Sequence, residues 1–114
     1  MPDNLDQLSA LVLMRERPDA LLRLLSTCHR RCWTPTALRW TTDGDHGEAA
    51  LRLSAPAGRC APASVTAHLG RLVDVLGVVC EVEPGLPDEV AFAALRARAP
   101  WRIAARGGLA LVAG

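Results

Sequence analysis

The residues best suited to chemistry in this chain are its four cysteines and three histidines. Cys28, His29 and Cys32 carry side-chain types that bind zinc. Their Cys-x3-Cys spacing is not the usual zinc hook, and no second cysteine pair follows. Cys28 also falls on the apolar stripe of an expected helix, where a free cysteine acts as a small hydrophobic side chain. We therefore expect Cys28 to serve packing, with no metal site.

Cys60 and His68 carry the residue types of a nucleophilic thiol and its base, but no flanking signature supports this pair. Gly107-Gly108 does not precede a helix with the lysine that a phosphate loop requires. Carboxylates are scattered along the chain. The residues thus predict a protein that is not an enzyme and needs no cofactor. A small enzyme with a dimer-interface pocket, lined by His46, Cys60 or His68, is kept as an alternative.

Composition limits the remaining classes. The chain has 114 residues, half of them apolar, which fits one domain with a modest core. A net charge of +1 gives no basic footprint for nucleic acid and no polybasic membrane patch. No apolar run approaches the length of a membrane span, and the acidic start lacks a signal-peptide core. We expect a cytoplasmic protein with reduced cysteines.

Hydrophobic periodicity predicts the elements that must position these residues. Residues 1–7 are expected to be a flexible start, and the dense apolar run 8–15 predicts a central strand. Pro18 suits the first position of a helix over residues 18–30, which carries one apolar stripe. Residues 33–42 predict a strand, placed at a sheet edge because Pro35 cannot donate to a ladder.

The second half repeats this pattern. Residues 43–47 predict a turn, and strict alternation predicts a strand over residues 48–55. Five apolar residues at helical spacing predict a helix over residues 64–76, with Ser64 as its cap and Gly77 after its end: Val65, Leu69, Leu72, Val73 and Leu76. Residues 78–83 predict the last strand.

The tail, residues 84–114, supports two interpretations. Pro87-Asp88-Glu89 is typical of a helix start, yet the alternation that follows also fits a strand. Trp101-Arg102-Ile103-Ala104, Gly107-Gly108 and Leu109–Val112 indicate a hairpin. We treat this segment as a C-terminal extension.

Two β-α-β units of this size predict an α+β, ferredoxin-like βαββαβ sandwich. It would have a four-stranded antiparallel sheet with both helices on one face. Trp33 and Trp40 are seven residues apart, so they are expected to face opposite sides of their strand, one of them exposed at a subunit contact. The alternative is that both lie in the core or are partly covered. Arg39 is a further interface candidate.

Three segments carry a likeness to a known family: Glu16-Arg17-Pro18-Asp19-Ala20-Leu21, His29-Arg30-Arg31-Cys32-Trp33, and the run from His68 to Val78, in which Leu72-Val73-Asp74-Val75 is the most specific part. Residues 8–83 resemble the ACT domain of the small regulatory subunits of acetohydroxyacid (acetolactate) synthase. The resemblance implies a non-catalytic protein that binds and activates or regulates the catalytic subunit in branched-chain amino-acid biosynthesis. A homodimer with edge strands paired into one continuous sheet is expected, because the strand over residues 33–42 would otherwise present unpaired backbone groups. A stand-alone amino-acid-binding ACT module with another client enzyme is the alternative.

The resemblance also implies where a branched-chain amino-acid effector would bind. That place is the turn formed by Glu16, Arg17, Pro18, Asp19 and Ala20. The family's asparagine falls at Glu16 and its glycine at Asp19. Because glycine lets backbone approach a ligand closely, and Asp19 would repel a carboxylate, we expect weak effector binding or none.

Overall fold

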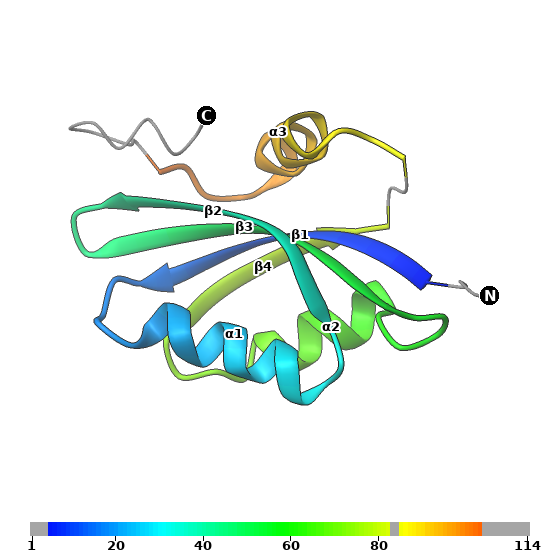
Figure 1. Ribbon diagram of the computed structural model, residues 1–114. Coiled ribbons are helices and arrows are strands. Elements are labelled where there is room, and N and C mark those ends of the chain that lie inside the picture. Colours follow the sequence, from blue (N-terminus) through cyan, green and yellow to red (C-terminus); the bar gives the residue numbers. More distant parts are fainter. Residues whose placement is uncertain (1–4, 83–84, 104–114) are drawn as a thin grey trace.

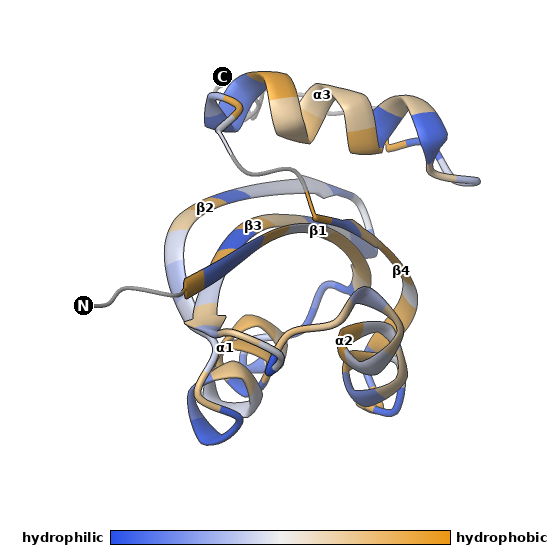
Figure 2. Cartoon of the chain, turned by 90° about the vertical axis from the view of Figure 1, so that its right-hand side faces the viewer, coloured by the Kyte–Doolittle hydropathy of each residue, from blue (hydrophilic) through white to orange (hydrophobic). Residues whose placement is uncertain are grey.

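The protein is an α+β domain with a four-stranded antiparallel sheet and three helices (Figure 1). The computed structural model describes residues 5–82 and 85–103. The elements are β1 (Leu5–Arg15), α1 (Ala20–Arg30), β2 (Thr34–Asp43), β3 (His46–Pro56), α2 (Pro62–Leu69), β4 (Val75–Glu81) and α3 (Asp88–Arg98). The strand order is β2-β3-β1-β4. Helices α1 and α2 cover one face of the sheet, which curves around them, and α3 lies on the other (Figures 1 and 2).

Strand β3 follows the predicted alternation, and β1 is the predicted central strand with apolar residues on both faces. Ala49, Leu51 and Leu53 of β3 are buried toward α1 and α2 in the larger core, together with Val12 of β1. Leu11 points the other way, into a smaller core under α3. Strand β1 begins at Leu5, three residues before the expected start, because its pairing with β3 continues to Pro56.

Helix α1 forms where its apolar stripe predicts, but it begins at Ala20, so the prediction of Pro18 as its first residue is wrong. Leu24 and Cys28 are fully buried against the sheet, while the helix ends on basic residues that suit its negative terminus. Asp19 occupies the position before the first helical residue and pairs through its carboxylate with Arg23, one turn later. Burial raises the pKa of the Cys28 thiol to about 11, which fits a packing role.

Helix α2 is shorter than predicted. It begins at Pro62 and ends at Leu69, so the prediction of a helix over 64–76, with Ser64 as cap and Gly77 past its end, is wrong. A side chain at Gly70 would come within 2.9 Å of the Thr66 carbonyl oxygen, and the chain turns there. Gly77 lies in β4, where the Trp101 ring packs against it.

Strand β2 is an edge strand, as Pro35 predicts, but the facing of its tryptophans was predicted wrongly. An irregularity between Pro35 and Ala37 inserts one extra residue relative to β3. A one-residue insertion reverses the facing of every later side chain. Trp33 and Trp40 consequently both pack against the larger core.

The tail contributes the third helix. Pro87-Asp88-Glu89 is indeed a helix start, and the strand alternative is wrong. Phe92 and Leu95 of α3 are buried against the sheet, so the second sheet face is covered and not open. Of the expected hairpin, residues 101–103 form no regular structure, and the rest lies outside the described residues.

No helix in residues 5–82 and 85–103 is both long and apolar enough to span a bilayer.

Candidate basic cleft

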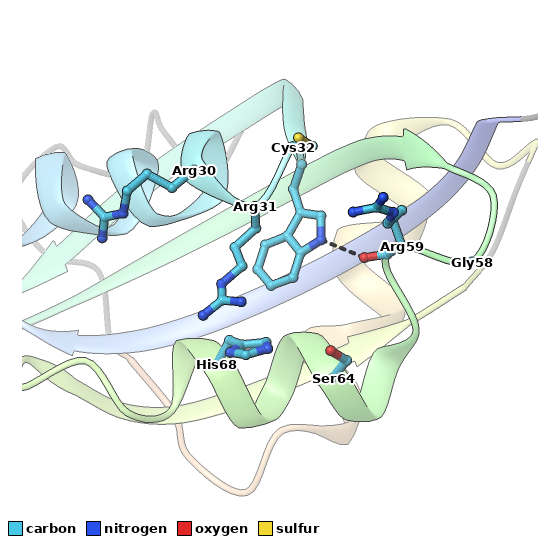
Figure 3. A pocket seen from close by; sticks show the side chains of 8 residues that line it. Arg30, Arg31, Cys32, Gly58, Arg59, Ser64 and His68 are labelled. Carbon is cyan, nitrogen blue, oxygen red and sulfur yellow. Dashed lines mark hydrogen bonds between the residues drawn. The ribbon is translucent and has the colours of Figure 1, made fainter.

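A cleft of about 320 Å³ opens where the end of α1 meets the start of α2 (Figure 3). Its walls come from the α1–β2 turn, the β3–α2 loop and the exposed side of α2. The residues that line it are Arg30, Arg31, Cys32, Trp33, Gly58, Arg59, Ser64 and His68. Three of these eight described residues are arginines and none is an aspartate or glutamate. We call this site the basic cleft.

The turn after α1 fixes one wall. The Trp33 N–H donates to the Cys28 carbonyl at 2.9 Å and the Cys32 N–H donates to the His29 carbonyl at 3.0 Å. This is a Schellman motif, which places the residue after the helix cap in the left-handed region. Cys32 occupies that position with φ of 64°, where glycine is usual. The turn leaves Arg30 and Arg31 exposed and sends Trp33 into the core.

Trp33 joins this wall to the opposite loop. Its Nε1–H donates to the Arg59 carbonyl oxygen at 2.7 Å (Figure 3). Its ring centroid lies 6.0 Å from that of His68 on α2, tilted by 54°. The Gly58 N–H donates to the Asp6 carboxylate at 2.9 Å, which holds the loop to β1. These contacts join the base of the cleft to the β3–α2 loop, to α2 and to β1.

No carboxylate among the described residues that line the cleft neutralises its three arginines. Six arginines elsewhere form ion pairs with carboxylates: Arg17, Arg23, Arg39, Arg52, Arg96 and Arg98. Within the part of the chain that the structure describes, Arg30, Arg31 and Arg59 form none; Arg30 reaches only the Thr27 hydroxyl, at 3.4 Å. The Arg31 side chain extends toward His68 (Figure 3). Desolvation lowers the pKa of His68, and the positive charges of Arg31 and Arg71 lower it further.

The turn predicted to hold an effector lies at the other end of α1. Arg17 and Arg23 both pair with the buried Asp74 carboxylate, at 3.3 Å and 2.8 Å, and Arg23 also pairs with Asp19. Ala20 is buried, whereas Glu16 and Pro18 are exposed. The polar groups of this turn are largely bound to one another, and weak effector binding or none stays a prediction.

The predicted interface residues are dispersed. Trp33 is only 2% exposed, so it offers no surface to a partner, contrary to its assignment as a contact residue. Trp40 is half-buried over Gly47. Arg39 binds Glu89 of α3 at 2.6 Å and lies 6.0 Å from the centre of the Phe92 ring, so it holds α3 to the sheet. The extra residue in β2 and the docking of α3 account for these differences.

Cys60 and Cys80 do not have the lowered pKa of a nucleophilic thiol. Cys60 is 1% exposed, and desolvation raises the pKa of its thiol, as do the Asp6 charge and Cys80. Cys80 donates to the Pro62 carbonyl oxygen, and burial raises its pKa. A catalytic cysteine needs a lowered pKa. Within residues 5–82 and 85–103, no three His, Cys, Asp or Glu side chains gather to hold a metal.

The basic cleft was missed at the sequence level, although one signal was present. Residues 20–42 and 49–73 contain no aspartate or glutamate, yet they carry seven of the thirteen arginines, among them Arg30, Arg31 and Arg59.

 A basic residue without an acidic neighbour in sequence has fewer local partners. The sequence alone does not say that the turn after α1 and the loop before α2 meet.

Comparisons with known proteins address the fold. No protein-family model matches the chain, and no curated protein matches it. Among solved structures, it is similar to the solution structure of the C-terminal domain of the MgtC protein from Mycobacterium tuberculosis. The TM-score is 0.56 at 16% sequence identity, and the match covers 75% of this chain and 95% of that one. At this identity the likeness concerns the fold alone.

These comparisons correct the family assignment made from sequence. The similar structure is a domain of MgtC, a different family from the small subunits of acetohydroxyacid synthase. The assignment to that family, and the regulation of acetolactate synthase inferred from it, are therefore wrong. The likeness of the run Leu72-Val73-Asp74-Val75 to that family depends on its being the end of a helix. In the structure Leu72, Val73 and the buried Asp74 form a turn, and Val75 is the first residue of β4.

Proposed function

We propose that this chain is a non-catalytic binding domain whose basic cleft holds the anionic group of a small ligand. The observation that carries the proposal is the set of three arginines, with Ser64 and His68, around one cleft without a lining carboxylate among the described residues. Guanidinium groups bind phosphate and carboxylate oxygens through paired, charge-assisted hydrogen bonds. A volume of about 320 Å³ fits a small molecule.

Several features favour binding over catalysis. The buried thiols have raised pKa values, which disfavours the thiolate that a nucleophile requires. His68 lies beside the Trp33 ring, and its lowered pKa keeps it neutral near pH 7. A neutral imidazole next to arginines can accept or donate one hydrogen bond to a bound oxyanion.

We also propose the finer fold class, a ferredoxin-like βαββαβ sandwich to which α3 is added. Support comes from the strand order β2-β3-β1-β4 and from the two crossover helices on one face. In this arrangement the end of α1 and the start of α2 lie side by side at one end of the sheet, which is where the basic cleft forms.

The direct test is a titration of the full chain with sulfate, inorganic phosphate and citrate, followed by NMR. We expect saturable shifts of the Arg31 Nε–H and of the Ser64 and His68 amides. Arg31→Gln should weaken binding about tenfold or more, because a hydrogen bond to a charged group contributes roughly 1.5–3 kcal/mol. Stronger binding of phosphate and sulfate than of citrate would indicate a phosphorylated ligand, and the reverse would indicate a carboxylate.

Arg15→Gln is the matched control, since Arg15 is also exposed but lies at the end of β1 that pairs with His46. It should leave anion binding unchanged. The proposal is refuted if none of the three anions shifts the cleft signals, or if both variants weaken binding equally.

Anion binding should also depend on pH through His68. In the free chain the pKa of His68 lies below its ordinary value near 6.5, so the unfolded state binds more protons and the histidine's contribution lowers stability as pH falls below about 6.5. A bound dianion offsets the charges of Arg31 and Arg71 and raises this pKa. Binding then takes up a proton and strengthens as pH falls.

Sulfate is the right probe for this linkage because its charge is constant between pH 5 and 8. The His68 ring signals, followed against pH, should titrate at a higher pH with sulfate than without it. His68→Gln should abolish the pH dependence of binding, whereas His46→Gln, in the β2–β3 hairpin, should retain it. An unchanged His68 titration in saturating sulfate would contradict the linkage.

A further inference from the structure

The sheet has two edges, and they differ in how they are protected. Edge strand β2 carries Pro35 and an inserted residue, both of which interrupt pairing with a further strand. Edge strand β4, Val75–Glu81, contains no proline and no basic residue, and three of its seven residues are valine. Nothing in its sequence discourages another strand from pairing with it.

Exposed apolar side chains lie near the start of β4 and just past its end. Leu76 and Val82 are each 44% exposed. They lie three residues on either side of Val79, so a two-fold axis at Val79 places Leu76 of one copy opposite Val82 of the other. The same axis pairs Gly77 with Glu81 and Val78 with Cys80, and no like charges face each other. Glu81 is already paired with Arg98 of α3.

We propose that two copies of this chain associate through antiparallel pairing of their β4 strands, which makes one continuous eight-stranded sheet. The occupant of the edge is a second copy because the exposed residues of β4 are complementary to themselves under two-fold symmetry. The basic cleft of each copy stays open, since its lining residues come from α1, α2 and the loops beside them. The dimer and the anion site are independent of each other.

The test is the mass of the full chain in solution, measured by light scattering and sedimentation over a range of concentrations. Wild type should have the mass of two chains. The double variant Leu76→Lys/Val82→Lys should have the mass of one, because lysine on an edge strand opposes pairing. Its far-ultraviolet circular dichroism should be unchanged, since both side chains are exposed.

The control is Leu22→Lys/Val73→Lys, which alters two more exposed apolar residues, 65% and 76% exposed, on the helical side. This variant should remain a dimer. In a mixed sample of differently labelled chains, NMR should give contacts between Leu76 and Val82 methyl groups of different copies, which tests the register even where a variant fails to fold. A monomer at all concentrations, or a dimer lost only in the control, would overturn the proposal.

Discussion

Replacing Trp33 with alanine should lower the free energy of unfolding by about 3–5 kcal/mol, the usual cost of removing a large aromatic side chain from a core. Trp33 is 2% exposed and is the largest of the fully buried side chains. It follows the turn that ends α1, and its Nε1–H bond to the Arg59 carbonyl oxygen ties that turn to the β3–α2 loop. Since small domains are stable by only about 5–15 kcal/mol, the variant should be close to unfolding at 37 °C.

Urea denaturation followed by circular dichroism measures this loss. Trp33→Phe is the informative partner variant, because it keeps most of the ring and removes the N–H donor. It should cost about 1–3 kcal/mol through the cavity and the unpaired Arg59 carbonyl. It should also weaken sulfate binding, because the loop that carries Arg59 loses its anchor. A loss below 1 kcal/mol for Trp33→Ala would show that the core closes over the gap.

The parts of the fold that could be predicted are those where one local pattern decides. The alternation in β3 is compatible only with a strand, and the apolar stripe of α1 only with a helix. Pro35 places β2 at an edge. The end of α2 could not be predicted in this way. Leu72, Val73 and Leu76 continue the helical spacing, although the helix ends at Leu69 with Gly70 as its cap. Periodicity does not distinguish a helix from a turn and strand that bury alternate residues.

The basic cleft could not be predicted from the sequence for a different reason. Its charges come from segments 26 or more residues apart in the chain, as the hydrogen bond from Trp33 to Arg59 illustrates. The facing of Trp33 and Trp40 depended on a single inserted residue in β2, which no propensity marks. The family resemblance drew attention to Arg17, Asp19 and their neighbours, where the structure has ion pairs.

The sequence left α3 open between a helix and a strand, and its attachment to the sheet combines a small apolar core with buried polar groups. Glu48 is 4% exposed and accepts hydrogen bonds from Arg96 and the Trp101 Nε1–H, at 3.2 Å and 2.9 Å. Arg52, also 4% exposed, donates to the Leu86 carbonyl oxygen at 2.9 Å. The larger core lies on the opposite face of the sheet, under α1 and α2, so detachment of α3 would leave it covered (Figure 2). We therefore expect α3 to open as a separate cooperative unit.

Phe92→Ala tests this expectation with a large effect. Phe92 is 1% exposed and is the largest apolar side chain that α3 contributes to the smaller core. Its removal should reduce the free energy of opening α3 by about 3 kcal/mol or more, and so speed amide hydrogen exchange in residues 88–98 roughly a hundredfold. Amides of β1 and β3 should change much less. Val90→Ala, on the same helix at a half-exposed position, should alter exchange little. Equal acceleration in α3 and in the central strands would mean that the helix and the sheet unfold together, and the polar face beneath α3 would then be an integral part of the core.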